Sequence, residues 1–311
     1  MLPSSSWVLT EDYAGLRAQA SGLAEAVGLA PEIRALRPRG LWRRLPAAWW
    51  PRPLSAVEPA ALAPPWPELA IGCGGKSAAV LAALARHMRV VIVQHPRMAP
   101  RRFDLVVAAR HDQLTGPNVL VTRTALHRVT PARLAEAAAG WQARLAALPR
   151  PLVAVLVGGS NGRFRLDAAV GATLAGQLAE MMRRDRVGVA LTPSRRTDPV
   201  VRAMLRDRLQ PLGAWIWDMA GENPYFGLLG LADAIVVTGD SVSMVSEAVA
   251  TAAPVLLVEL PGRSRRIGLF TRFLIEDGRV RRFSGRLEHW PVEPVNDTGA
   301  VAAELCCRFG Y

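Results

Sequence analysis

The sequence predicts an α/β protein built from two Rossmann-like domains that face a cleft. First, a chain of 311 residues is long enough for two domains of ordinary size. Second, 50% of the residues are hydrophobic, which is ample for two cores. Third, apolar strands alternate with amphipathic helices from Trp7 onward and again from Leu152 onward.

The first alternation starts with the apolar strand Trp7–Thr10. A later strand, Leu69–Ile71, runs into the glycine turn GCGGKS at residues 72–77. This turn is not a P-loop, because Ala70 stands where the first glycine is required. It is not a dinucleotide fingerprint either, because the next strand ends in Gln94 rather than in an acidic residue. The turn therefore either holds a phosphate at a helix N-terminus or only reverses the chain.

Prolines mark the predicted domain boundary. Helix Pro131–Leu148 ends at the hinge Pro149–Pro151, which gives domains at 1–148 and 149–311. The second domain is predicted to contain strands at Leu152–Val157, Val187–Leu191, Trp215–Trp217, Ala234–Thr238 and Val255–Val258, with helices at Asp167–Arg184, from Asp198, at Asn223–Leu231 and at Asp297–Phe309.

The chain is organised around its strand–turn–helix–strand segment at residues 231–260. Ser241 is a natural helix N-cap, and a helix N-terminus at the carboxyl end of a parallel strand suits an anion. We expect a diphosphate to rest on this opening, whose residues are Asp240, Ser241, Val242 and Ser243. Glu247 lies one turn further on the face of Ser243, where its carboxylate suits ribose hydroxyls. The alternative is that Glu247 is a solvated helix residue.

Two other strand ends add phosphate-binding candidates. Gly158, Gly159 and Ser160 follow the strand from Leu152, and glycine permits a close approach to a phosphate. Ser194, Arg195 and Arg196 follow the next strand, where two guanidinium groups can bind a diphosphate in bidentate fashion. A solvated arginine pair is the alternative. Asn223, which opens a later helix, completes the candidate set.

The chain carries a formal net charge of +12, and Lys76 is its only lysine. The excess of positive charge indicates an anionic partner. A nucleotide or an anionic lipid surface is preferred to nucleic acid, because the aromatic residues form no recognisable nucleic-acid-binding motif. The Trp- and Arg-rich segment Leu41–Pro53 and the segment Arg263–Arg282 are candidates for contact with anionic lipid. The alternatives are tryptophans that pack on their own domain and an amphipathic helix that packs on the core.

The sequence gives no sign of a metal site, a resident cofactor or a disulfide framework. Its three cysteines lack both disulfide and zinc spacing. The histidines show no metal-ligand spacing, and Asp-x-Asp does not occur. No secretory signal or membrane-spanning apolar stretch is recognisable. We therefore expect a metal-independent cytoplasmic protein that can associate with the inner face of the cytoplasmic membrane.

Two resemblances extend this interpretation. Residues 223–260 resemble the nucleotide-sugar-binding segment of GT-B glycosyltransferases, particularly the peptidoglycan N-acetylglucosaminyltransferase type, in which the Glu of a Ser-Glu pair holds the ribose. Almost the whole chain resembles the bacterial relatives of the plant "elongated mitochondria" fission factor. The supporting blocks are QHPR at 94–97, RRFDLVVAARHD at 101–112, GPNVLVT at 116–122, SRRT at 194–197 and GENPYFG at 221–227.

The resemblance implies a GT-B glycosyltransferase that moves a sugar from a nucleotide-diphospho-sugar to a lipid-linked or cell-envelope polysaccharide acceptor. It also implies a last helix that returns to the first domain. For an inverting transfer, the catalytic base is sought at the first domain's strand ends, where Glu11 and Asp12 lead and His95 follows. The alternative is a non-catalytic, membrane-associated protein that recruits a fission factor.

Overall fold

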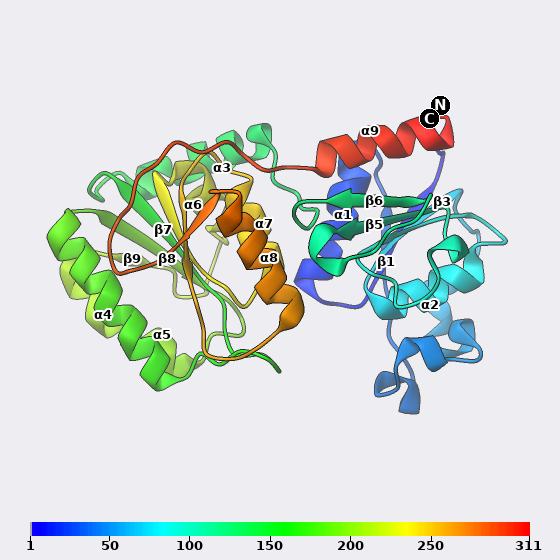
Figure 1. Cartoon of the computed structure of the whole chain (residues 1–311), viewed down its shortest axis with the longest axis horizontal. Helices are drawn as coiled ribbons and strands as arrows, with labels where there is room; N and C mark the ends of the chain where they lie inside the picture. Colours follow the sequence, from blue (N-terminus) through cyan, green and yellow to red (C-terminus); the bar gives the residue numbers. More distant parts are fainter. Residues whose placement is uncertain (1) are drawn as a thin grey trace. The chain divides into compact units, whose positions relative to one another are not determined.

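The computed structural model describes residues 2–311, which form two compact α/β units. Unit 1 runs to Arg128 and takes in Asn296–Tyr311, and unit 2 comprises Val129–Val295 (Figure 1). The sequence predicts a boundary after the helix at 131–145, at residues 148/149. In the structure the units divide before this helix, between Arg128 and Val129. This helix belongs to unit 2 because its Trp141 and Leu145 are buried there.

Unit 1 contains a six-stranded parallel sheet in the order β2-β1-β3-β4-β5-β6. The strands are β1 (Ser6–Thr10), β2 (Glu32–Ala35), β3 (Leu69–Cys73), β4 (Arg89–Val93), β5 (Leu105–Ala109) and β6 (Val119–Thr122), and the helices are α1 (Ala14–Val27), α2 (Gly75–Leu84) and α9 (Thr298–Phe309). The last helix, α9, packs on α1, so the end of the chain completes the first unit (Figure 1).

Unit 2 contains a second six-stranded parallel sheet in the order β12-β11-β10-β7-β8-β9. The strands are β7 (Leu152–Val157), β8 (Gly188–Pro193), β9 (Trp215–Ile216), β10 (Ala234–Thr238), β11 (Val255–Val258) and β12 (Val280–Arg282). The helices are α3 (Pro131–Leu145), α4 (Ala168–Asp185), α5 (Pro199–Leu209), α6 (Tyr225–Leu231), α7 (Val242–Val249) and α8 (Arg265–Glu276).

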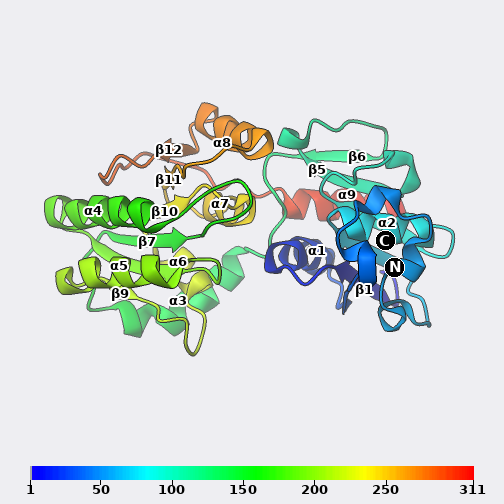
Figure 2. The same cartoon turned by 90° about the horizontal axis from the view of Figure 1, so that it is seen from below.

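Helices cover both faces of each sheet, so the central strands are buried on both sides (Figures 1 and 2). In β7, Val153 and Val155 contribute to the core beneath α4 and α5, whereas Leu152 and Leu156 contribute to the core beneath α3, α6, α7 and α8. This explains why the strands read as continuous apolar runs rather than as an alternating pattern. Burial of these runs is the main favourable term in forming each sheet.

The central strands lie where the sequence predicts them, and the edge strands β2, β6 and β12 are the main omissions. All three are short, and β2 and β12 also carry charged residues, which hide the strand signal. In the Arg263–Arg282 segment, Phe270 and Leu274 of α8 lie in the core, so α8 packs on its own unit through this side. Arg279, beyond α8, is buried and donates to the carbonyl oxygens of Val249, Thr251 and Ala253 at the end of α7.

Candidate functional site

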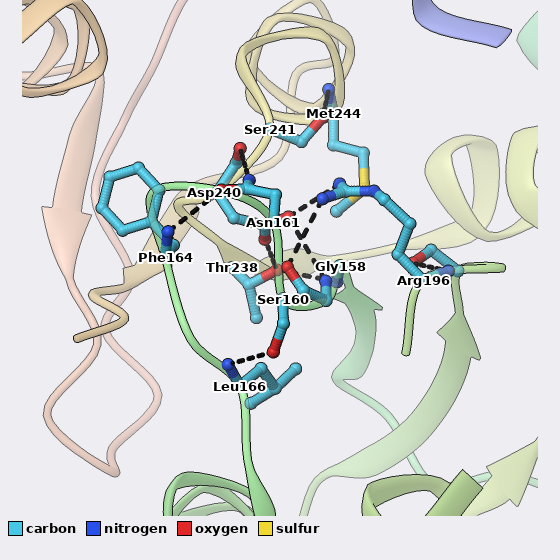
Figure 3. Close-up of polar contacts among 12 residues, drawn as sticks. Gly158, Ser160, Asn161, Phe164, Leu166, Arg196, Thr238, Asp240, Ser241 and Met244 are labelled. Carbon is cyan, nitrogen blue, oxygen red and sulfur yellow. Dashed lines mark hydrogen bonds and ion pairs between the residues drawn. The ribbon is translucent and has the colours of Figure 1, made fainter. Parts of the chain in front are cut away.

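In each sheet, the strand order reverses at one point, where open α/β sheets bind their ligands. In unit 2 this point lies at the carboxyl ends of β7 and β10, because the chain proceeds from β7 to β8 on one side and returns to β10 on the other. All of the predicted nucleotide-sugar ligands lie in unit 2, and the loops after β7, β8 and β10 bring several of them together (Figure 3). In unit 1 the reversal lies at β1 and β3.

The Asp240 carboxylate is the centre of the unit 2 site (Figure 3). Its side chain is completely buried, yet it pairs with the Arg196 guanidinium, Nη2 to Oδ2, at 2.7 Å. It also accepts the Gly159 N–H at 3.2 Å and the Thr238 hydroxyl at 2.7 Å. These contacts tie together the ends of β7, β8 and β10. The Asp240 carboxylate therefore occupies the Gly159 N–H and the Arg196 guanidinium, which are donors of the kind that bind phosphate.

Glycine is required on the β7 loop because neighbouring groups approach its backbone closely. A Cβ at Gly158 would overlap the Asp240 carboxylate, and a Cβ at Gly159 would overlap the Arg196 carbonyl group. At Gly162, later in the same loop, an added Cβ would meet nothing within 4 Å. The two glycines predicted to approach a phosphate thus approach protein groups in this structure.

Three other predicted ligands organise the loops. Ser160 Oγ accepts the Leu166 N–H at 2.9 Å, and Ser194 Oγ accepts the Arg196 N–H at 3.2 Å. Asn223 Oδ1 accepts the Tyr225 N–H at 3.0 Å and so starts α6. Each of these side chains satisfies a backbone donor, as serine and asparagine commonly do in turns. Any contact of these side chains with a ligand would be additional to these backbone hydrogen bonds.

The opening of α7 matches the sequence analysis in its local structure. Ser241 is the N-cap, and its hydroxyl oxygen accepts the Met244 N–H at 3.3 Å. Val242 and Ser243 form the first turn and are partly buried. The Arg195 and Arg196 side chains are both exposed, but the Arg196 guanidinium also pairs with Asp240. The interpretation of both arginines as a solvated pair is therefore wrong for Arg196.

Glu247 is not a solvated helix residue. It is 8% exposed, and its Oε2 accepts the Tyr225 hydroxyl at 2.6 Å. Burial raises the pKa of Glu247 from 4.5 to about 7, although the Tyr225 hydrogen bond acts in the opposite direction. Burial, and then the nearby Glu247 charge, raises the pKa of Tyr225 well above 10.0. The pair is a buried acid–phenol contact one turn behind the helix opening.

In unit 1, an ion pair spans the point where the strand order reverses. Lys76, in the glycine turn after β3, contacts Glu11, after β1, with Nζ 2.7 Å from Oε1. Asp12 is exposed and pairs with Arg17 at 3.3 Å. His95 Nδ1 accepts the Arg97 N–H at 2.9 Å, so the neutral imidazole carries its proton on Nε2. In this arrangement the Nε2 of His95 is a hydrogen-bond donor.

The structure adds residues that the sequence analysis did not select. Thr238 Oγ1 accepts the Gly158 N–H at 2.8 Å and donates a hydrogen bond to Asp240 Oδ1 at 2.7 Å. Thr238 ends β10 only two residues before Asp240, so its closeness in sequence was an available signal. Tyr225 and Lys76 gave no comparable signal, since their partners lie far away in sequence.

A small hollow lies at the carboxyl ends of β8 and β9, beside Trp217 and Asp218. The Trp217 ring adds a flat apolar surface there. Within residues 2–311, no group of three or more His, Cys, Asp or Glu side chains is arranged to hold a metal ion. Over the same residues, no helix is both long and apolar enough to cross a bilayer.

Residues 14–309 match the sequence profile of the family described as Mitochondrial fission ELM1. The chain belongs to this family. It is 33% identical over 270 residues to the mitochondrial fission protein ELM1 of Arabidopsis thaliana, a match that covers 77% of this chain and 63% of the relative. It is also 27% identical over 161 residues to an uncharacterized protein of Rickettsia prowazekii (strain Madrid E), over 49% of this chain and 45% of that protein. The chain thus spans less than two thirds of these relatives.

Solved structures establish the GT-B fold for this ELM1-family chain. The UDP-GlcNAc 2-epimerase of Methanocaldococcus jannaschii has a TM-score of 0.61 at 12% identity, covering 98% of this chain and 99% of that one. A UDP-glucosyltransferase of Polygonum tinctorium has a TM-score of 0.55 at 12% identity, covering 98% and 90%. MurG of Acinetobacter baumannii has a TM-score of 0.50 at 14% identity, covering 98% and 91%. At these identities the likeness concerns the fold.

Proposed function

We propose that this protein is a metal-independent glycosyltransferase that uses a nucleotide-diphospho-sugar donor. Unit 2 binds the donor: the diphosphate lies at the N-terminus of α7 beside Arg195, and Glu247 binds the ribose hydroxyls. The nucleotide base lies beside Trp217 and Asp218, at the end of β9. The acceptor is lipid-linked or a cell-envelope polysaccharide presented at the inner face of the cytoplasmic membrane. No nucleic acid or resident cofactor takes part.

The observation that carries this proposal is the buried Glu247 carboxylate behind the α7 opening. A buried carboxylate is unfavourable unless its charge is compensated, so its presence on α7 indicates a function. Tyr225 satisfies one of its oxygens, and the carboxylate can accept from further hydroxyl groups. A ribose diol supplies two such donors. The solved UDP-GlcNAc 2-epimerase of Neisseria meningitidis, a GT-B neighbour with a TM-score of 0.54, contains UDP-GlcNAc, which makes UDP the first nucleotide to test.

On the acceptor side, Glu11 and Asp12 are the proposed bases. This proposal is supported by their position after β1, at the point where the strand order of unit 1 reverses and where open α/β sheets bind ligands. Lys76 fixes the Glu11 side chain. His95, with its donor at Nε2, is proposed to hydrogen-bond to the acceptor rather than to remove its proton.

The donor assignment is tested by titrating UDP and its dideoxy analogue against the wild type and Glu247→Gln. We expect the variant to lose about 10- to 100-fold in affinity for UDP, because hydrogen bonds to a charged group are worth about 1.5–3 kcal/mol. The analogue should bind both proteins equally. Tyr225→Phe is the matched control: it removes the competing hydroxyl and should keep or improve UDP binding. Equal affinities of the wild type for UDP and the analogue would overturn the ribose assignment.

A non-catalytic recruitment function is the second candidate, and one structural feature favours it. The Asp240 carboxylate already neutralises Arg196 and accepts the Gly159 N–H, so an internal group fills the anion-binding position. The family name also fits this candidate. Thermal stabilisation by a panel of nucleoside diphosphates separates the two functions. Stabilisation by one nucleotide supports the transferase, and stabilisation by none supports recruitment.

A further inference from the structure

One segment of unit 1 combines exposed apolar side chains with unpaired positive charge. It consists of Leu41, Leu45 and Trp49, which are 79%, 39% and 72% exposed, and of Arg39, Arg44 and Arg52; we call it the 39–52 surface. It lies on short 3-10 helical turns at Gly40–Arg43 and Ala47–Trp49, between β2 and β3. Figure 1 shows these turns, in blue, beyond α2.

The exposure of Trp49 is not a consequence of a loosely packed segment. The next residue, Trp50, is 5% exposed in the core beneath α2, and its ring meets that of Trp42 edge-on at 6.3 Å. Arg43 Nε donates to the Pro38 carbonyl at 2.9 Å, which fixes the first turn. The segment is therefore anchored by one set of side chains and presents another set outward. Large apolar side chains that are held in water in this way commonly mark an interaction site.

The charge of the surface identifies the chemistry of its partner. No acidic residue occurs from Ile33 to Val57. Among residues 2–311, the side chains of Arg39, Arg44 and Arg52 have no ion-pair partner, in contrast to Arg37, which lies 3.9 Å from Glu58. Exposed leucine and tryptophan side chains suit the interfacial layer of a membrane, and arginines beside them suit anionic lipid headgroups.

We propose that the 39–52 surface docks this protein on an anionic lipid membrane. Trp49, Leu41 and Leu45 enter the interfacial layer, and the three arginines contact lipid phosphates. Docking requires no nucleotide. If the proposed transfer is correct, docking also places a lipid-linked acceptor near Glu11, because Lys76 donates both to Glu11 Oε1 and, at 3.4 Å, to the Arg43 carbonyl oxygen.

Co-sedimentation of the full chain with vesicles tests the proposal. The wild type should bind vesicles of phosphatidylcholine and phosphatidylglycerol in equal parts, bind phosphatidylcholine alone much less, and lose binding as salt is added. Arg39→Gln/Arg44→Gln/Arg52→Gln should weaken binding by about 100-fold, at roughly fivefold for each arginine near the surface. The corresponding triple lysine variant should retain it. Leu41→Ser/Trp49→Ser should weaken binding by about tenfold or more.

Matched controls are available in the same unit. Val121 is 54% exposed, and Arg86, Arg101 and Arg102 are exposed arginines outside the 39–52 surface. Val121→Ser and Arg86→Gln/Arg101→Gln/Arg102→Gln should bind vesicles like the wild type. If the control arginine triple weakened binding as much as the 39–52 triple, binding would reflect net charge and the proposal would be wrong. Retained binding of Leu41→Ser/Trp49→Ser would also overturn it. Neither result would bear on nucleotide binding, which is measured separately.

Discussion

In each unit, loops follow the carboxyl ends of the parallel strands where the strand order reverses. The polar contacts within these loops differ between the two units. In unit 1, Lys76 and Glu11 form an ion pair whose side chains are 24% and 17% exposed. In unit 2, the Asp240 side chain is completely buried, and it binds Arg196, Thr238 and the Gly159 N–H. The ion pair of unit 1 is therefore partly exposed to water, whereas the loops of unit 2 bury the Asp240 carboxylate completely.

A ligand therefore meets different conditions in each unit. A ligand of unit 1 can approach groups that water already reaches. An anionic ligand of unit 2 must either replace Asp240 as the partner of Arg196, whose side chain is 42% exposed, or bind at the α7 opening without the Gly159 N–H. The more buried arrangement also makes unit 2 more sensitive to substitution, because a polar group buried without a partner is costly.

The largest effect should come from the glycine turns. Gly159→Ala places a Cβ against the Arg196 carbonyl and should destabilise unit 2 by about 3 kcal/mol or more. Gly162→Ala, in the same loop, should change stability by less than about 0.5 kcal/mol. In unit 1, Gly75→Ala meets only Arg97 Cγ at 4.0 Å and should be similarly mild. Denaturant unfolding measures all three, and a mild Gly159→Ala would show that the loop of unit 2 is as open as that of unit 1.

The pH dependence of stability should have opposite signs in the two units. The pKa of Glu247 rises from 4.5 to about 7 on folding, so native unit 2 binds a proton that the unfolded chain has lost, and stability falls as pH rises across that window. In unit 1, burial lowers the pKa of His127 from 6.5 to about 4, against the attraction of Asp297. Its contribution is therefore lost as pH falls across that window. Each effect should be about 3 kcal/mol.

Hydrogen exchange measures the stability of each unit separately, through amides of β7 and β10 for unit 2 and of β3 and β4 for unit 1. Glu247→Gln should flatten the pH dependence of unit 2 alone, and His127→Gln that of unit 1 alone. Parallel pH profiles in the two units, unchanged by these variants, would contradict the assignment of opposite buried groups.

A smaller effect should separate the two ion pairs. Asp240→Asn should cost about 2 kcal/mol, because Arg196 loses its charged partner while the site stays buried. Glu11→Gln should cost about 0.5–1 kcal/mol, because water partly replaces the lost contact with Lys76. Thermal unfolding at low and high salt measures both, and salt should reduce the Glu11 effect more strongly. Equal losses in the two variants would remove the distinction between a hydrated and a buried pair.

The sequence by itself determined the α/β class, the central strands and the turn at the α7 opening. These features depend on local patterns: buried strands need apolar runs such as Ala234–Thr238, and a helix start needs a cap such as Ser241. The resemblance extended this to the GT-B fold, which the solved structures confirm.

Tertiary structure alone decided the partners of the polar residues and the exposure of similar neighbours. Asp240 and Arg196 lie far apart in sequence, and only the pairing of β10 with β7 and of β7 with β8 brings them together. Glu247 is buried because Tyr225 of α6 packs over it. Trp49 and Trp50 are adjacent and identical in type, yet one is exposed and the other is in the core. Such outcomes depend on long-range packing, which no local pattern encodes.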